Sequence, residues 1–190
     1  MAEFKSIKKA FDGRVVLNDF SLNLKKGSKT AIMGESGSGK TTLLRIAAGL
    51  EKADEGLFEH DGKLAVMFQE PRLLPWKNAK QNIEAVLKKE NHHLAEKYLK
   101  TVGLSDAAEK SPHELSGGMA QRVAFARFLA YAEESGADLL LLDEPFSALD
   151  KETADKMVSV LRQASHDKTV VLVTHDPIQA EAFADRIVNI

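Results

Sequence analysis

The sequence predicts an α/β fold in which a mostly helical segment is inserted between the two halves of a core. Two continuous apolar runs, residues 139–142 and 170–173, are typical of strands buried on both faces of a parallel sheet. Residues 3–33 alternate apolar and polar side chains between glycine-containing turns, which indicates β-structure. Residues 78–134 instead carry apolar side chains at helical spacing.

The same patterns predict the order of strands and helices along the chain. Strands and hairpins are expected over 3–33 with turns at 12–13 and 26–27, a helix over 42–50, and a second pair of strands over 56–68 with a turn at 60–62. After the helical segment 78–134 we expect a strand at 139–142, a helix at 151–164, a strand at 170–173, a helix at 177–184 and a last strand at 186–190.

The composition is that of an ordinary globular protein. The chain has 190 residues, of which 44% are hydrophobic and 28% charged, and its net charge is −2, which gives no indication of a nucleic-acid partner. It has no cysteine, which excludes disulfides and thiolate metal sites. No apolar run is long enough to span a bilayer, and the first residues lack the apolar segment of a signal peptide, so we expect residence in the cytoplasm.

A glycine-rich segment, Gly34-Glu35-Ser36-Gly37-Ser38-Gly39-Lys40-Thr41, lies between an expected strand at 28–33 and an expected helix. It fits the phosphate-binding P-loop pattern, in which glycines let successive backbone N–H groups point at one anion and a helix N-terminus adds its positive dipole. Lys40 would reach the β- and γ-phosphates, and Thr41 would ligate Mg²⁺. An ordinary glycine- and serine-rich surface loop is the alternative, and the strand–loop–helix context argues against it.

Two carboxylates follow the apolar run 139–142. Ligands of α/β sheets collect at the carboxyl ends of strands, so Asp143 is placed to hold Mg²⁺ through water and Glu144 to act as a general base. Neighbouring residues of a strand face opposite ways, which would divide the two roles. The alternative is a strand that leaves the core into an acidic turn. His175 follows run 170–173 in the same way and could orient water, although in isolation it resembles a capping or surface histidine.

A second glycine-rich segment, Leu115-Ser116-Gly117-Gly118-Met119, precedes an expected helix at 119–134 and has no evident role within its own subunit. The Ser116 hydroxyl and the N–H groups of Gly117 and Gly118 would form an anion site at the start of that helix. A helix start with a flexible glycine lead is the alternative.

Six motifs in a fixed order resemble the ATP-binding subunit of an ABC transporter along nearly the whole chain. They are Walker A (34–41), the Q-loop glutamine Gln69, the signature (115–119), Walker B with its catalytic glutamate (139–144), the D-loop (147–150) and the switch histidine His175. The resemblance implies a P-loop NTPase fold of ABC type and a single ABC ATPase domain over 1–190. Its RecA-like core and N-terminal antiparallel β-subdomain would take 1–77 and 135–190, and its helical subdomain 78–134.

The resemblance also implies an ATPase that works as a head-to-tail homodimer, in which the signature of one subunit faces the P-loop of the other around ATP. The catalytic residues it implies are Glu144, His175, Gln69 and Lys40, and the Mg²⁺ ligands are Thr41, Gln69 and Asp143. The nucleotide-binding residues it implies are Phe11, at the place of an adenine-stacking aromatic that is usually tyrosine, and Gly34, Glu35, Ser36, Gly37, Ser38, Gly39, Lys40, Thr41, Thr42, Ser116, Gly117 and Gly118.

Two features are similar to the nitrate/sulfonate/taurine branch of importers: Met119 in place of the common glutamine, and the run 67–76 with its prolines and Trp76. This branch implies a membrane permease that docks near residues 69–80, an extracytoplasmic substrate-binding protein that acts indirectly, no nucleic acid, and a peripheral position on the inner face of the cell membrane. Core packing of Trp76 and turn formation by the prolines are the alternative. The cargo is not encoded here, because the permease and the binding protein select it.

Three departures from the family pattern stand out. The spacing from Lys40 to Gln69 is short, which predicts a trimmed β-subdomain, and residues 131–138 are slightly long. The chain ends at Ile190, soon after the last expected strand, so we expect no C-terminal regulatory domain.

Two other functions compete with the importer subunit. A soluble ABC-type ATPase in DNA repair, chromosome structure or translation would carry long coiled coils, zinc modules or tandem domains, and none of these is apparent. A degenerate partner without turnover would have lost catalytic positions, whereas Lys40, Glu144, Ser116 and His175 are all present.

Overall fold

The strands of the computed structural model, which describes residues 2–190 and leaves Met1 outside, form two sheets. The antiparallel sheet has the order β2-β1-β4, with β1 Ala2–Phe11, β2 Arg14–Leu24 and β4 Glu55–His60. The parallel sheet has the order β5-β6-β7-β3-β8, with β5 Leu64–Met67, β6 Leu139–Asp143, β7 Thr169–Val173, β3 Lys29–Met33 and β8 Arg186–Asn189.

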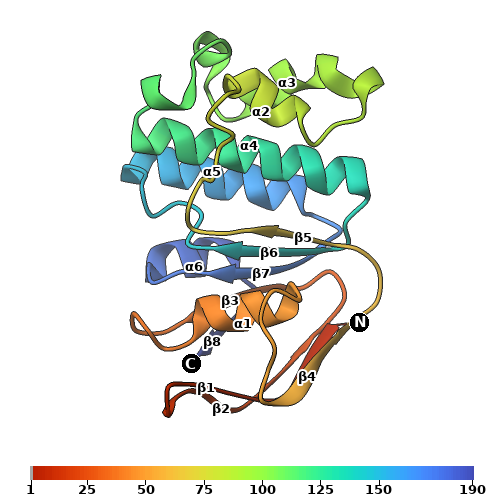
Figure 1. The fold of residues 1–190 in the computed structure, drawn as a ribbon, viewed down its shortest axis with the longest axis vertical. Helices are drawn as coiled ribbons and strands as arrows, with labels where there is room; N and C mark the ends of the chain where they lie inside the picture. Colours follow the sequence, from red (N-terminus) through yellow and green to blue (C-terminus); the bar gives the residue numbers. More distant parts are fainter. Residues whose placement is uncertain (1) are drawn as a thin grey trace.

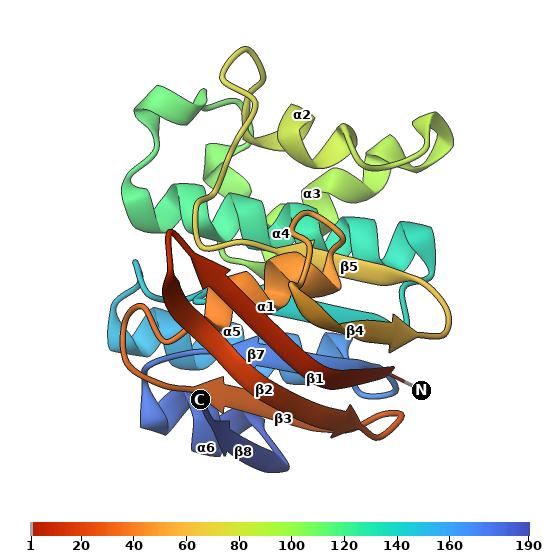
Figure 2. The ribbon, with the colours of Figure 1, turned by 60° about the horizontal axis from the view of Figure 1, so that its bottom comes forward.

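Most of the helices cover one face of the parallel sheet, and the helix Lys40–Ala47 lies on the opposite face together with the antiparallel sheet (Figures 1 and 2). The α-helices are α1 Lys40–Ala47, α2 Ala79–Glu84, α3 Ala95–Thr101, α4 Gly117–Ser135, α5 Lys151–Ala164 and α6 Pro177–Phe183. Short 3₁₀ helices occupy Lys89–Leu94, Ser105–Ala107 and Pro112–Glu114. Helices α4 and α5 form the layer next to the sheet, and α2 and α3 lie outside them. These elements confirm the predicted α/β class. Within the described chain, every helix is too short or too polar to cross a membrane.

The parallel sheet separates two apolar clusters. Every residue of β6 and β7 is buried, as the continuous apolar runs predict. Along β6, Leu140 and Leu142 pack with helices α4 and α5, whereas Leu139 and Leu141 pack with α1 and the antiparallel sheet. The sheet is therefore the shared wall of both halves of the core.

Two of the expected hairpins are wrong. The β1–β2 hairpin is present, with Phe11 opposite Arg14. However, β3 pairs with β7 and β8 rather than with β2, and β5 pairs with β6 rather than with β4. The turns at 26–27 and 60–62 pass the chain from one sheet to the other. A turn signal marks where a chain changes direction, but tertiary packing decides which strand becomes the partner.

The long helix α4 belongs to both layers. Nine of its 19 residues are buried, because α2 and α3 pack on one side of it and β5 on another. An independent helical subdomain over 78–134 therefore stays a prediction, since one of its helices is also the inner cover of the core.

Core packing at β6 can be tested by truncating one leucine. Leu141 is 0% exposed, so Leu141→Ala should lower the free energy of unfolding by about 2–5 kcal/mol. Leu50, which is 62% exposed after α1, is the matched control, and Leu50→Ala should change it by less than about 0.5 kcal/mol. Urea unfolding followed by circular dichroism measures both, and equal losses would contradict the assigned core.

Candidate functional site

A cavity of about 560 Å³ opens at the carboxyl ends of β3, β6 and β7. Residues from separate motifs line it: Phe11, Val16, Ser36, Gly37, Gly39, Lys40, Thr41, Thr42, Gln69, Asp143, Glu144 and His175. All of these except Val16 were expected from the sequence. The fold therefore brings together residues that are up to 164 positions apart in the chain, from Phe11 to His175.

The glycine-rich loop wraps around the ammonium group of Lys40, at the first position of α1. Lys40 Nζ donates hydrogen bonds to the backbone oxygens of Gly34 (2.8 Å) and Glu35 (2.7 Å), and lies 3.4 Å from Ser38 Oγ. The lysine side chain is buried, at 8% exposure. Gly34, Glu35 and Ser38 thus surround the charge of Lys40 and do not line the cavity itself.

Gly39 allows the loop to turn tightly into α1. It is the N-cap of this helix, with a left-handed backbone φ of 99°. A Cβ atom there would lie 2.8 Å from Leu17 Cδ2 and 2.9 Å from the backbone oxygen of Val16. Neither the conformation nor the space suits any other residue.

Asp143 ends β6 beneath the cavity and is 1% exposed. Within residues 2–190, both of its carboxylate oxygens are buried without a hydrogen-bond partner. Burial raises the pKa of Asp143, and the negative charge of Glu144 adds to this, whereas the nearby Thr41 hydroxyl and the charge of Lys40 lower it. The Thr41 hydroxyl is close enough to act on this pKa but does not reach hydrogen-bonding geometry. A buried carboxylate without partners suits a position that a bound cation completes.

Glu144 projects from a turn and not from the strand. β6 ends at Asp143, and Glu144 has a left-handed φ of 47° while its N–H donates to the oxygen of Val173 at 2.9 Å. The different directions of the two carboxylates therefore come from this backbone turn, so the expected strand alternation is the wrong explanation. Such a φ in a non-glycine residue costs about 1–3 kcal/mol and is typical of functional positions.

His175 contacts Glu144 directly. Its Nδ1 atom lies 2.8 Å from Glu144 Oε2, and the exposed fractions of the two side chains are 67% and 12%. The histidine is thus the solvent-facing partner of a nearly buried carboxylate, which argues against its being an isolated surface residue.

Val16 is a cavity residue that the sequence did not mark. It lies on β2, beside Gly39, and shares the outer wall of the cavity with Phe11, which is 42% exposed at the end of β1. The alternation of this segment predicts strands, but it does not say which face of a strand reaches a distant loop. Lys9 Nζ lies 4.9 Å from the centre of the Phe11 ring on the same strand.

The signature residues lie apart from this cavity. Helix α4 begins at Gly117, two residues earlier than expected, and its exposed N-cap Ser116 accepts a hydrogen bond from the N–H of Met119 at 3.2 Å. Gly118 packs closely on the D-loop, because a Cβ there would lie 3.2 Å from the oxygen of Ala148. Within one chain the fold therefore does not bring Ser116, Gly117 and Gly118 to Lys40.

The segment from Gln69 to α2 is an extended loop on the surface. Gln69 lines the cavity from the beginning of this loop. Further along, Trp76 is 74% exposed, so the core-packing alternative for this residue is wrong.

Comparison with known proteins identifies the family. The model of the ABC transporter family matches residues 17–147. The chain belongs to this family. Three curated relatives are named as ATP-binding proteins for import of aliphatic sulfonates: SsuB 2 of Agrobacterium fabrum (45% identity, covering 95% of this chain and 72% of the relative), SsuB 2 of Frankia alni (45%, 97% and 74%) and SsuB 1 of Paraburkholderia xenovorans (43%, 99% and 56%). These names agree with the expected importer branch.

Solved structures give the same result for the fold. The chain superposes with a TM-score of 0.90 on the ATP-binding cassette MJ0796, described as a dimer in a post-hydrolysis state with ADP and Pi. The sequence identity is 33%, and the match covers 100% of this chain and 94% of that one. A second dimeric structure of this bacterial ABC transporter cassette matches with the same TM-score.

Gly39 offers a steric test of the nucleotide site in this ABC protein. Gly39→Ala should add about 1–3 kcal/mol of strain at the first turn of α1, and this would weaken ATP binding by about 5- to 150-fold. Gly49→Ala is the control, because Gly49 also has a positive φ, 69°, but has open space around it. Calorimetric titration with Mg-ATP measures both variants, and equal affinity in the two would contradict the role of Gly39.

Proposed function

We propose that this chain is the ATP-hydrolysing subunit of an importer, and that two copies close around two ATP molecules to drive a partner permease. The observation that carries the proposal is the convergence of Lys40, Asp143, Glu144 and His175 on one cavity at the carboxyl edge of the parallel sheet. It combines a cation for phosphate, a buried carboxylate and an oriented base, which are the parts that phosphoryl transfer to water needs.

ATP would bind with its phosphates in the glycine-rich loop and its base at the outer wall. The Lys40 ammonium, held at the cavity by the loop carbonyls, would move onto the β- and γ-phosphates. Phe11 and Val16 offer an apolar wall on which the adenine ring would pack.

Mg²⁺ would be held by Thr41, Gln69 and Asp143. The partnerless, buried oxygens of Asp143 fit this ion. In the described part of the chain no group of three or more His, Cys, Asp or Glu side chains could hold a metal, so phosphate oxygens and water would complete the shell, as is usual for Mg²⁺. When bound, the ion would neutralise the charge that develops on the phosphates.

Glu144 would act as the general base for the attacking water. Its nearly buried carboxylate faces the cavity and is fixed by the contact with His175. The carboxylate would accept a proton from water as the oxygen attacks the γ-phosphorus, and the bond to ADP would break, which yields ADP and phosphate.

The signature would complete the site of a second copy. An anion site would be formed by the N–H groups at the first turn of α4 together with the exposed Ser116. The nucleotide cavity of the same chain lies elsewhere, so this site would have no phosphate to bind within its own chain. The dimeric state named for MJ0796 supports a homodimer. In a head-to-tail arrangement of the two copies, this site would face the partner's γ-phosphate. Loss of this phosphoryl group removes the contact that favours the closed state, so hydrolysis would reopen the dimer.

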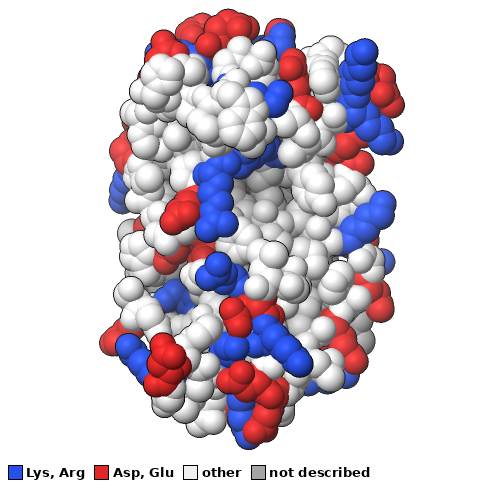
Figure 3. All heavy atoms as spheres, in the orientation of Figure 1, with Lys and Arg blue, Asp and Glu red and all other residues white. Residues whose placement is uncertain are grey.

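The names of the relatives support a cargo of aliphatic sulfonates. The permease would dock on the exposed loop within residues 69–80. This would place the chain on the inner face of the cell membrane. An extracytoplasmic binding protein would deliver the cargo to the permease. On the face drawn in Figure 3, acidic and basic side chains are interspersed, and we propose no nucleic-acid partner.

Uptake by right-side-out membrane vesicles that contain ATP tests the importer against the soluble alternative. The chain is co-expressed with a candidate multispan sulfonate permease and a sulfonate-binding protein, and the membrane fraction is assayed for bound chain and for ATP-dependent transport of hexanesulfonate. We expect membrane recovery and uptake that Lys40→Ala abolishes. Recovery only as a free soluble ATPase would contradict the proposal and favour a role in DNA repair, chromosome structure or translation.

A further inference from the structure

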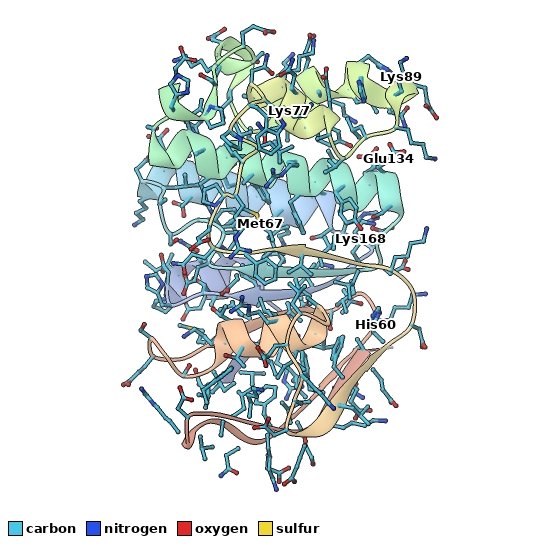
Figure 4. All side chains as sticks on the ribbon, viewed as in Figure 1. His60, Met67, Lys77, Lys89, Glu134 and Lys168 are labelled. Atoms are coloured by element: carbon cyan, nitrogen blue, oxygen red, sulfur yellow. The ribbon has the colours of Figure 1, made fainter. Side chains whose placement is uncertain are left out.

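The loop between β5 and α2 crosses helix α4 on the outside of the molecule (Figure 1). Figure 4 labels residues near its two ends, Met67 on β5 and Lys77 just before α2. The loop carries Gln69 at the cavity and Trp76 on the surface. Helix α4, which it crosses, begins with the signature glycines.

Arg127 of α4 holds the first half of this loop. Its Nη2 donates to the backbone oxygens of Pro71 (2.8 Å) and Arg72 (3.1 Å), and its Nη1 donates to Arg72 O (3.1 Å) and to Asn82 Oδ1 (3.4 Å). Arg72 has a left-handed φ of 43°, a conformation that a non-glycine residue keeps only when its surroundings impose it. Burial lowers the pKa of Arg127, so its guanidinium depends on these carbonyls in place of water.

Asn82 of α2 holds the second half of the loop. Its side chain is 0% exposed, accepts from the N–H of Leu74 at 2.8 Å and donates to the oxygens of Lys77 and Asn78, each at 3.0 Å. Because Arg127 also donates to Asn82, one network fastens the whole loop to α4.

Side-chain packing between loop and helix is incomplete. A hollow of about 170 Å³ lies between Phe68, Arg72, Arg127 and Phe128, on the loop-bearing side of the molecule where Figure 3 shows a depression. Since apolar packing does not fill this space, the hydrogen bonds of Arg127 are what hold this part of the loop to α4.

We propose that Arg127 is the positioning residue that transmits movement of α4 to the loop containing Trp76. The inference rests on the proposed function, in which the partner's nucleotide displaces the N-terminus of α4. A helix rises about 1.5 Å per residue, so Arg127 lies about 16 Å along α4 from Ser116, and a stiff helix carries a displacement over this distance. The competing route runs through Gln69, which joins the same loop to the cavity directly.

Arg122 provides a matched control on the same helix. Its Nη1 also donates to two backbone oxygens, those of Val102 (3.2 Å) and Gly103 (3.4 Å), but both lie after α3 and outside the loop. A substitution there removes the same kind of bond and leaves the loop connection intact.

Trp76 is a built-in reporter, because it is the only tryptophan of the chain and is 74% exposed. Acrylamide quenching of its fluorescence is measured with and without Mg-ATP in a Glu144→Gln background, together with ATP binding by equilibrium dialysis and mass by light scattering. We expect Mg-ATP to change the quenching constant of this parent and of Arg122→Met. Arg127→Met should lose the change while its ATP affinity stays within about twofold of the parent.

Arg127→Lys is the conservative variant. It keeps the charge but is slightly shorter and cannot bridge two carbonyls with a planar fork, so it should also lose most of the response. It serves as the test if Arg127→Met does not fold. A parent that stays monomeric with Mg-ATP would overturn the proposed function. A normal dimer whose Trp76 signal does not move, or moves equally in the Arg127 variants, or is lost equally in Arg122→Met, would overturn this inference alone.

Discussion

Glu144→Gln is expected to lower ATP hydrolysis by about 10²- to 10⁴-fold, the usual contribution of a general base, and to trap two copies as a stable Mg-ATP dimer. The amide keeps the size and shape of the carboxylate and can still contact His175 Nδ1, which lies 2.8 Å from the glutamate oxygen. It cannot accept the proton of water. Binding and closure should therefore persist while cleavage, which would reopen the dimer, stops.

Phosphate release measures the rate of ATP hydrolysis, and light scattering measures the mass of the trapped dimer. Glu152→Gln is a suitable control, because Glu152 is 81% exposed on α5 and pairs with Lys156 one helical turn away; it should behave as the unmodified chain. Hydrolysis by Glu144→Gln at the parental rate would show that another group is the base. An unchanged mass with saturating Mg-ATP would contradict closure of a homodimer.

Ser116→Arg is expected to abolish dimer closure and to lower hydrolysis by about 10²- to 10³-fold, comparable to the removal of one preorganised donor to a reacting oxyanion. ATP binding to the monomer should stay within about twofold, because Ser116 does not line the cavity that contains Lys40. The long arginine side chain would extend from an exposed N-cap into the space that the partner's γ-phosphate would enter.

Two controls separate this occlusion from damage to helix α4. Ser116→Ala removes the cap bond to Met119 N–H, which costs about 1 kcal/mol of stability, but leaves the N–H groups of Gly117 and Gly118 accessible and should lose much less activity. Mixing Ser116→Arg with Lys40→Ala subunits creates a dimer with one intact composite site, so part of the activity should return. Loss of ATP binding by the Ser116→Arg monomer would mean that the signature acts within its own chain.

The sequence predicts those parts of the fold that local pattern determines. The apolar runs of β6 and β7 and the helical spacing of α5 locate these elements to within a residue or two, because burial on both faces or on one face leaves a clear pattern. The partners of β3 and β5 were not predictable in the same way. Both follow turns that suggest hairpins, and only packing against the rest of the core assigns them to the parallel sheet.

The residues of the candidate site also fall into those that the sequence predicts and those that only the fold reveals. The glycine-rich loop, Asp143, Glu144 and His175 carry recognisable motifs, and the fold does bring them to one cavity. Val16 and Arg127 carry no motif. A valine in a strand and an arginine in a helix are common, and their importance appears only when a loop distant in sequence is placed against them.

The hydrogen bonds of Lys40 to two loop carbonyl groups have a thermodynamic consequence. The glycine-rich loop is already wound about a cation of its own chain, with donor–acceptor distances of 2.7 and 2.8 Å. An incoming polyphosphate would therefore replace the loop carbonyl groups as the partner of Lys40. The loop backbone already has a defined conformation and would not have to become ordered when the polyphosphate binds. Little conformational entropy is spent at that moment, so most of the interaction with nucleotide remains to favour association of the two subunits.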